Sequence, residues 1–102
     1  MPKKDRLHTL YKWLRSNPIA SINALDLLDQ HGLMTTGEIA GSLDLSRGVV
    51  SKLIKSLESK GWVSVKETPK DRRVRTVALT TIGKRELDSR VMELETIIGR
   101  IS

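Results

Sequence analysis

The sequence contains no cysteine, no phenylalanine and few aromatic residues of any kind. Without cysteine the chain has no disulfide, no thiolate zinc site and no cysteine nucleophile or thiol redox sensor. Its aromatic residues, Tyr11, Trp13 and Trp62, are too few for a platform that stacks successive nucleotide bases. Duplex nucleic acid is therefore a better candidate partner than single strands.

Long apolar runs are also lacking. No stretch approaches the roughly 20 apolar residues that cross a bilayer, and the N-terminal Met1-Pro2-Lys3-Lys4 is not followed by the apolar core of a signal peptide. We therefore expect a cytoplasmic protein with no membrane partner. At 102 residues the chain is expected to form one domain.

Positive charge is concentrated in one segment. The formal net charge of +6 lies entirely in residues 46–75, because residues 1–45 and 76–102 each carry equal numbers of acidic and basic groups. Nine of the eighteen Lys and Arg residues fall in this segment, opposed by three acidic residues. A charge localised in this way indicates a polyanionic partner.

Helical periodicity predicts two helices before this segment. The first is expected at residues 5–16, where Asn17-Pro18 ends it because the residue before proline is pushed out of the helical region. Ser21 is expected to cap the second helix, and Gly32 lies just past its end.

Two further helices are predicted from their capping residues. Thr35 and Glu38 have the spacing of a capping box, which predicts a short helix at about residues 36–42. After a three-residue connection, Ser46 is placed to cap a fourth helix that reaches Lys60. The buried stripe of that helix is expected to be Val50, Leu53, Ile54 and Leu57.

The remainder of the chain predicts a hairpin and a last helix. Residues 62–66 and 74–79 are rich in β-branched residues and indicate two antiparallel strands. Thr80 or Thr81 is expected to cap the final helix. The predicted fold is mainly α with a small β-hairpin, in the order α-α-α-α-β-β-α of a winged helix-turn-helix. Residues 1–17, 18–80 and 81–102 are expected to be its N-terminal helix, core and C-terminal dimerisation helix.

The fourth helix has the properties of a DNA recognition helix. A helix fits the major groove, where its N-terminal half meets base edges. Arg47 is long enough to reach a guanine edge. Gly48 costs about 1 kcal/mol of helix stability relative to alanine. It is expected either to let the helix backbone come close to the groove or merely to be a small residue where two helices cross. The candidate DNA-binding residues of this helix are Ser46, Arg47, Gly48, Ser51, Lys52 and Lys55.

The hairpin has the properties of a wing. Beside the rigid Pro69, its tip is suited to placing arginine in a neighbouring minor groove. The candidate wing residues are Lys70, Asp71, Arg72 and Arg73. Thr35 and Thr36 are candidate phosphate contacts, although local capping is the alternative role for both.

Several motifs resemble those of the MarR family of bacterial and archaeal regulators. They are Leu45-Ser46-Arg47-Gly48-Val49-Val50-Ser51-Lys52, Leu57-Glu58-Ser59-Lys60-Gly61-Trp62-Val63, Asp71-Arg72-Arg73 and Leu79-Thr80-Thr81-Ile82-Gly83. The resemblance implies that Asp71 orients the wing loop and Arg73 enters the minor groove. It also implies a homodimer on a palindromic operator, and most such regulators are repressors. Only one helix follows the wing where the family usually has two, so the resemblance does not extend to an effector pocket.

The last helix carries an apolar stripe that we interpret as a homodimer contact. Its members repeat at alternating steps of four and three and are Leu87, Val91, Leu94, Ile98 and Ile101. The alternative is packing against the first helix of the same chain.

The sequence favours a sequence-specific regulator of transcription that binds double-stranded DNA, acting as a repressor. An architectural or replication-associated DNA binder of a phage or plasmid is one alternative, and a winged-helix module that binds acidic proteins is another. An enzyme is not expected, because the chain has no phosphate loop, metal-ligand cluster or nucleophile elbow. No cofactor or metal is expected either.

Overall fold

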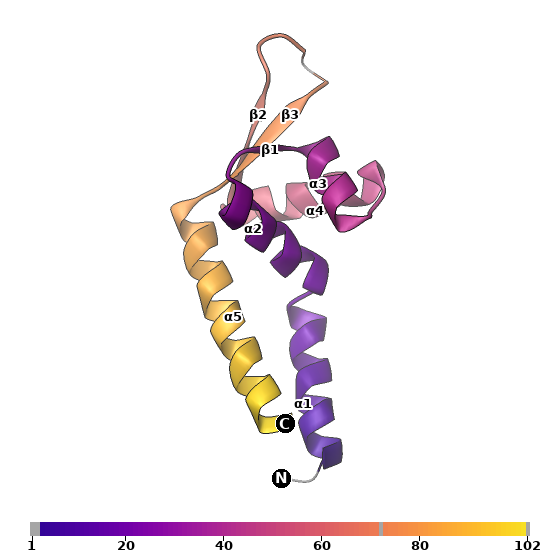
Figure 1. Cartoon of the computed structure of the whole chain (residues 1–102), viewed down its shortest axis with the longest axis vertical. Helices are drawn as coiled ribbons and strands as arrows, with labels where there is room; N and C mark the ends of the chain where they lie inside the picture. Colours follow the sequence, from indigo (N-terminus) through magenta and orange to yellow (C-terminus); the bar gives the residue numbers. More distant parts are fainter. Residues whose placement is uncertain (1–2, 72, 102) are drawn as a thin grey trace.

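The structure, a computed structural model, describes residues 3–71 and 73–101, and the side chains of residues 7–71 and 73–100. Its elements are α1 (Lys3–Ser16), α2 (Ile19–His31), β1 (Met34–Thr35), α3 (Thr36–Leu43), α4 (Arg47–Ser59), β2 (Val63–Glu67), β3 (Arg75–Leu79) and α5 (Thr81–Ile101). The molecule is elongated, with extents of 56 × 26 × 21 Å. At one end α1 and α5 lie side by side as a stalk, and at the other the β2–β3 hairpin projects from a winged half formed by residues 18–80 (Figure 1).

The predicted fold is confirmed, with one strand added. The structure is mainly helical, and α3 and α4 form a helix-turn-helix that is followed by the hairpin. The predicted order lacked β1, which pairs antiparallel with β3 so that the sheet order is β1-β3-β2. Met34 lies opposite Val77. A strand of two residues shows no alternation of apolar and polar residues, and its partner is distant in the sequence, so local patterns do not reveal it.

The predicted cap of α2 was wrong. The helix begins at Ile19 rather than after Ser21, and Pro18 occupies its N-cap with a φ of −56°. The carbonyl of Pro18 accepts a hydrogen bond from the Ser21 N–H at 3.0 Å. Proline has a φ already suited to the start of a helix, so its signal prevails over that of the serine.

The capping box of α3 is confirmed. The Thr35 hydroxyl accepts a hydrogen bond from the Glu38 N–H at 3.1 Å, and the Glu38 carboxylate accepts one from the Thr35 N–H at 3.0 Å. At the start of α4 the Ser46 hydroxyl accepts from the Val49 N–H at 3.2 Å. These bonds satisfy N–H groups in the first turns of both helices, so each helix has a defined start.

The hydrophobic core lies in the winged half and includes the first turns of α5. Its buried residues are Ile22, Ala24, Leu25, Leu28, Met34, Ile39, Ala40, Val50, Ile54, Leu57, Val63, Val77 and Leu87. Because α2, α3, α4 and β3 all contribute to it, the core holds both the recognition helix and the base of the wing. The predicted stripe of α4 is buried except at Leu53, which is half-buried.

The start of α5 is seated tightly against the turn that follows α4. The Thr80 hydroxyl accepts a hydrogen bond from the Gly83 N–H at 3.0 Å and donates one to the Gly61 carbonyl at 2.6 Å. A Cβ atom on Gly83 would clash with the carbonyl oxygen of Trp62. No side chain fits at this position without movement of the backbone, so a glycine is required where stalk and winged half meet.

A cluster of charges also joins α5 to the winged half. Lys84 Nζ lies 2.9 Å from a carboxylate oxygen of Asp29 on α2 and 3.1 Å from one of Asp88 on α5. The hydrogen bond to Asp29, followed by that to Asp88, raises the pKa of Lys84. The ammonium group is therefore held in its charged form between the two helices.

The residues of the predicted dimer stripe differ in how exposed they are in the structure. Leu87 is 2% exposed and Val91 is half-buried against the core, so both side chains are covered at least in part by their own chain. Leu94 is half-buried and Ile98 is 48% exposed, while the side chain of Ile101 lies outside those described. No helix in the described part of the chain is both long and apolar enough to span a membrane.

Candidate nucleic-acid interface

The outer face of α4 presents the predicted recognition residues to solvent. Val50, Ile54 and Leu57 hold the opposite face in the core. The exposed residues of the predicted set are Ser46, Arg47, Gly48, Ser51, Lys52 and Lys55. A helix anchored along one face and cationic along the other is suited to lie in a groove of duplex DNA.

Gly48 has no packing role in the chain. A Cβ atom built on it would meet nothing within 4 Å apart from its own helix and chain neighbours. The alternative that Gly48 permits two helices to cross is therefore excluded. A glycine in an open helical position is destabilising relative to alanine, and no contact within the chain requires it here.

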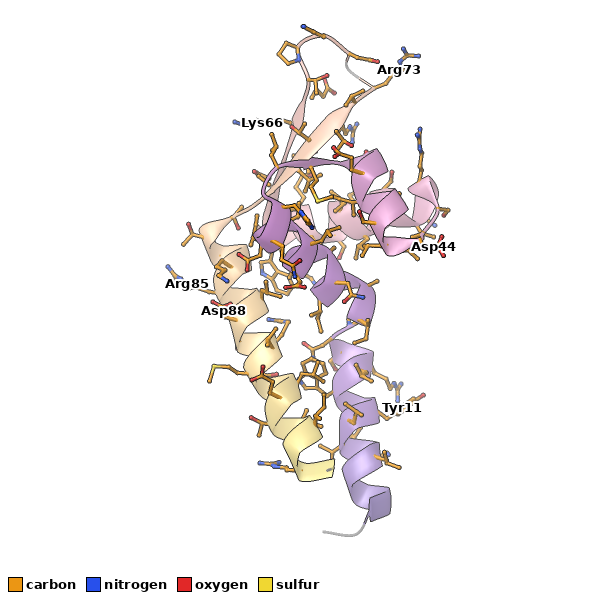
Figure 2. The ribbon with its side chains drawn as sticks, viewed as in Figure 1. Tyr11, Asp44, Lys66, Arg73, Arg85 and Asp88 are labelled. Atoms are coloured by element: carbon orange, nitrogen blue, oxygen red, sulfur yellow. The ribbon has the colours of Figure 1, made fainter. Side chains whose placement is uncertain are left out.

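The tip of the wing is ordered by Asp71. Its carboxylate accepts hydrogen bonds from the Arg73 backbone N–H at 2.9 Å and from Arg73 Nε at 3.2 Å. The side-chain bond to Arg73, followed by the backbone bond, lowers the pKa of Asp71. Arg73 remains 92% exposed, and Figure 2 shows it at the end of the molecule farthest from the stalk.

Thr68 is a structural residue of the wing that the sequence patterns did not identify. Its hydroxyl donates a hydrogen bond to the Asp71 carbonyl at 2.6 Å and accepts one from the Asp71 N–H at 3.2 Å. This pair of bonds closes the loop around Pro69 and Lys70, and Lys70 is exposed. The predicted wing residue Arg72 lies outside the described residues.

An open cleft separates α4 from the wing. It has a volume of about 450 Å³, and its lining residues are Thr36, Ser51, Ile54, Lys55, Glu58, Val65, Arg73 and Arg75. Arg75 was not among the predicted site residues. It is the first residue of β3 and lines the same cleft as Arg73, but the sequence alone does not show that this strand lies beside α4.

A second hollow continues the cleft towards the start of α3. It has a volume of about 310 Å³, and its lining residues are Thr35, Thr36, Gly37, Arg47, Ser51, Arg73 and Val74. The Arg47 guanidinium lies over the first turn of α3, with Nη2 3.9 Å from where a Cβ of Gly37 would stand. Arginines from the recognition helix and the wing therefore face one hollow. Thr36 lines both spaces, whereas the Thr35 hydroxyl is occupied in the capping box.

One cavity beside Trp62, where the stalk meets the winged half, is small. The cavity bounded by Pro18, Ile22, Trp62 and Arg90 has about 20 Å³, which is room for one water molecule. Arg90 and Lys60 lie over the Trp62 ring, at 4.4 Å and 4.7 Å from its centre. Among the described residues, no group of three or more His, Asp or Glu side chains could hold a metal ion.

The family model that matches the sequence is that of the MarR family, over residues 18–74. A relative in Bacillus subtilis (strain 168) is the uncharacterized HTH-type transcriptional regulator YcgE, 33% identical over 66 residues. The match covers 65% of this chain and 43% of that protein, so the chain spans less than half the length of this relative.

Solved structures share the fold over most of the chain. The YusO protein from Bacillus subtilis is 25% identical with a TM-score of 0.78, covering 92% of this chain and 74% of that one. AbfR in its overoxidized form bound to DNA is also 25% identical, with a TM-score of 0.73 over 83% of this chain and 64% of that one. The apo form of MarR from E. coli, at 22% identity and a TM-score of 0.75, matches in fold over 96% of this chain and 75% of that one.

Proposed function

This chain belongs to the MarR family, and on that premise we propose that it is a transcriptional regulator that binds double-stranded DNA. Members of the family are transcriptional regulators and not enzymes. We extend the proposal to a homodimer that represses transcription from an operator with inverted symmetry. The observation that carries it is the cleft in which α4 and the wing present arginine from two sides.

The shape of the cleft suits the path of one DNA strand. With α4 in the major groove, its N-terminal residues Arg47 and Gly48 meet base edges. The wing then reaches the adjacent minor groove, where Arg73 finds the negative potential that attracts arginine. The phosphates between the two grooves pass through the cleft, near Lys55 and Arg75. This arrangement supplies both a sequence-dependent and a charge-dependent contribution to binding.

The stalk supports the homodimer through its uncovered apolar surface. Leu7 is 49% exposed and Tyr11 61% exposed on α1, and Tyr11 points away from α5 (Figure 2). On α5, Met92 is 69% exposed and Ile98 48% exposed. Burial of these side chains against a second copy would remove apolar surface from water. It would also place two recognition helices at the spacing of one helical turn of DNA, roughly 34 Å.

Selection of bound duplexes from a random DNA pool tests the proposal. We expect an inverted repeat with half-sites about 10 base pairs apart. Recovery of unrelated sequences with equal affinity would instead identify an architectural DNA binder. In transcription reactions from a promoter that contains the selected site, added protein should lower the yield of RNA, whereas a rise would make the protein an activator.

Three arginine variants test the two contact surfaces. Arg47→Ala should lose on the order of 1 to 3 kcal/mol of specific binding and weaken discrimination at one base pair. Arg73→Ala should weaken binding to all sequences and reduce the salt dependence. Arg85→Ala is the matched control, because Arg85 is exposed on α5 away from the wing (Figure 2). An equal loss for Arg47→Ala on matched and mismatched sites would reduce its role to a phosphate contact.

The oligomeric state is tested by sedimentation at micromolar concentration. The wild type should sediment as a dimer and Met92→Glu as a monomer, because a buried unpaired carboxylate opposes association. Ile82→Glu is the control, since Ile82 is 52% exposed at the opposite end of α5. A monomeric wild type would refute the dimer and the inverted repeat together.

A further inference from the structure

One apolar side chain stands on the recognition helix without contributing to the core. Val49 is 49% exposed, although its neighbour Val50 is fully buried. Among the described residues of α4, Val49 is the one large apolar side chain that is exposed. The hydrogen bond from the Val49 N–H to the Ser46 hydroxyl, at 3.2 Å, fixes the turn that carries it.

The surface beside Val49 is open on the side of Gly48, and Lys52 follows Val49 one turn later on the exposed part of α4. Gly48 has no side chain, and nothing lies within 4 Å of where its Cβ would stand. The guanidinium of Arg47 lies over the first turn of α3 rather than over this surface. Gly48 and Val49 together therefore form a shallow apolar surface at the N-terminal end of α4. This is the end that meets base edges when such a helix enters the major groove.

The major groove offers one apolar partner for such a surface. Among the groups that base pairs present there, the C5-methyl of thymine is the apolar one, and the others are hydrogen-bond donors and acceptors. We propose that Val49, beside the open Gly48, contacts a thymine methyl group and selects a T·A pair at one position in each half-site. This inference rests on the proposed function, since it requires α4 to lie in the major groove.

Replacement of thymine by deoxyuridine tests the contact directly. The probe is the duplex selected from the random pool, with each thymine exchanged in turn for deoxyuridine, which removes the methyl group and leaves base pairing intact. Wild-type affinity should fall about three- to fivefold at one position in each half-site, as expected from the loss of one buried methyl group.

The variant Val49→Ser assigns the effect to its residue. Serine has neither of the two methyl groups of valine, so the preference for thymine over deoxyuridine at that position should fall to about one. Preferences at all other thymines should be unchanged. Ile82→Ser removes apolar atoms at an exposed residue of α5 and should leave every preference as in the wild type.

Two results would overturn the inference. One is wild-type binding that is indifferent to deoxyuridine at every position, and the other is a thymine preference that survives intact in Val49→Ser. Either result leaves selective binding by the wild type in place. Failure of the proposed function gives a different result, since no preferred duplex would then emerge from the random pool.

Discussion

The winged half and the stalk differ in how completely they bury their apolar residues. In the winged half Leu25, Ile39, Leu57 and Val77 are each fully buried. In the stalk none of the described α1 side chains is buried, Ile97 on α5 is 9% exposed, and Trp13 Nε1 donates a hydrogen bond to the Glu93 carboxylate at 2.7 Å. The winged half therefore has a complete core, whereas the stalk holds its two helices together with partly exposed contacts.

The comparison shows which half is less well stabilised within one chain. A helix pair that buries little apolar surface is only weakly stabilised, since apolar burial is the main favourable contribution to folding. An apolar groove beside Trp13, Met92 and Ile97 extends this uncovered surface along α5. We therefore expect the recognition surface to be stable within one chain, and the stalk to gain much of its stability from a second chain.

The largest difference in the free energy of unfolding should come from replacing a leucine with alanine in each half. Leu25→Ala should lower the free energy of unfolding by about 2–5 kcal/mol, because it leaves a cavity in a closed core. Leu10→Ala, at a half-buried position of the stalk, should have a much smaller effect. Chemical denaturation at a concentration where the protein is monomeric measures both. Equal losses would show that the stalk is as well packed as the winged half.

The junction between the halves should be nearly as sensitive. Gly83→Ala places a Cβ against the Trp62 carbonyl, and overpacking of this kind typically costs about 1–3 kcal/mol. Gly99→Ala is the matched control on the same helix, because Gly99 has open space around it and alanine favours helix formation. Thermal unfolding should therefore shift in opposite directions for the two variants. An unchanged unfolding temperature in Gly83→Ala would mean that the backbone around the start of α5 moves easily to make room for the added methyl group.

A third substitution separates stability from binding within the winged half. Gly48→Ala should raise the stability of the fold by about 0.5–1 kcal/mol, since alanine is the better helix former and has room at this site. The added methyl group should also hold α4 away from the groove and weaken DNA binding by about tenfold, equivalent to 1.4 kcal/mol. Denaturation and gel shifts on the same samples compare the two effects. Unchanged affinity would show that the backbone at Gly48 does not approach DNA.

The smallest expected effect is on the stability of the protein at low pH, through Glu38 in the capping box of α3. Hydrogen bonds from the Thr35 backbone, followed by the Thr35 side chain, lower the pKa of Glu38. Its contribution to stability is therefore present above about pH 4.5 and is lost as the pH falls through the lower pKa of the folded protein. Melting temperatures between pH 5 and pH 3 should decline less steeply in Glu38→Gln than in the wild type. Glu58→Gln, on the exposed face of α4, is the control and should follow the wild type.

Local sequence signals predicted the winged half well. The capping box of Thr35 and Glu38 and the helix end at Gly61 depend on residues a few positions apart, and both appear in the structure. The prediction that Ser21 caps α2 failed because Pro18, three residues earlier, offered a stronger start signal. The prediction missed β1 because its pairing with β3 is set by tertiary structure rather than by its own two residues.

The stalk was harder to predict, for a physical reason. An apolar stripe at helical spacing shows which face of α5 is buried, but not whether the burying surface belongs to the same chain. Leu87 is buried and Val91 half-buried within their own chain, whereas Met92, which lies off the stripe, is the most exposed of the apolar side chains that the structure describes on the helix. Charged residues posed the same difficulty in the wing, where Arg75 joins the cleft only through its position beside α4.

The two tryptophans divide between the two halves, and this gives the protein a built-in optical reporter for each. Trp62 is held at the junction between the cationic groups of Lys60 and Arg90, while Trp13 lies in the stalk next to Glu93. With no phenylalanine and a single tyrosine, nearly all near-ultraviolet absorption and emission comes from these two rings. Spectra of Trp13→Phe and Trp62→Phe would therefore follow events at the junction and in the stalk separately, without an attached dye.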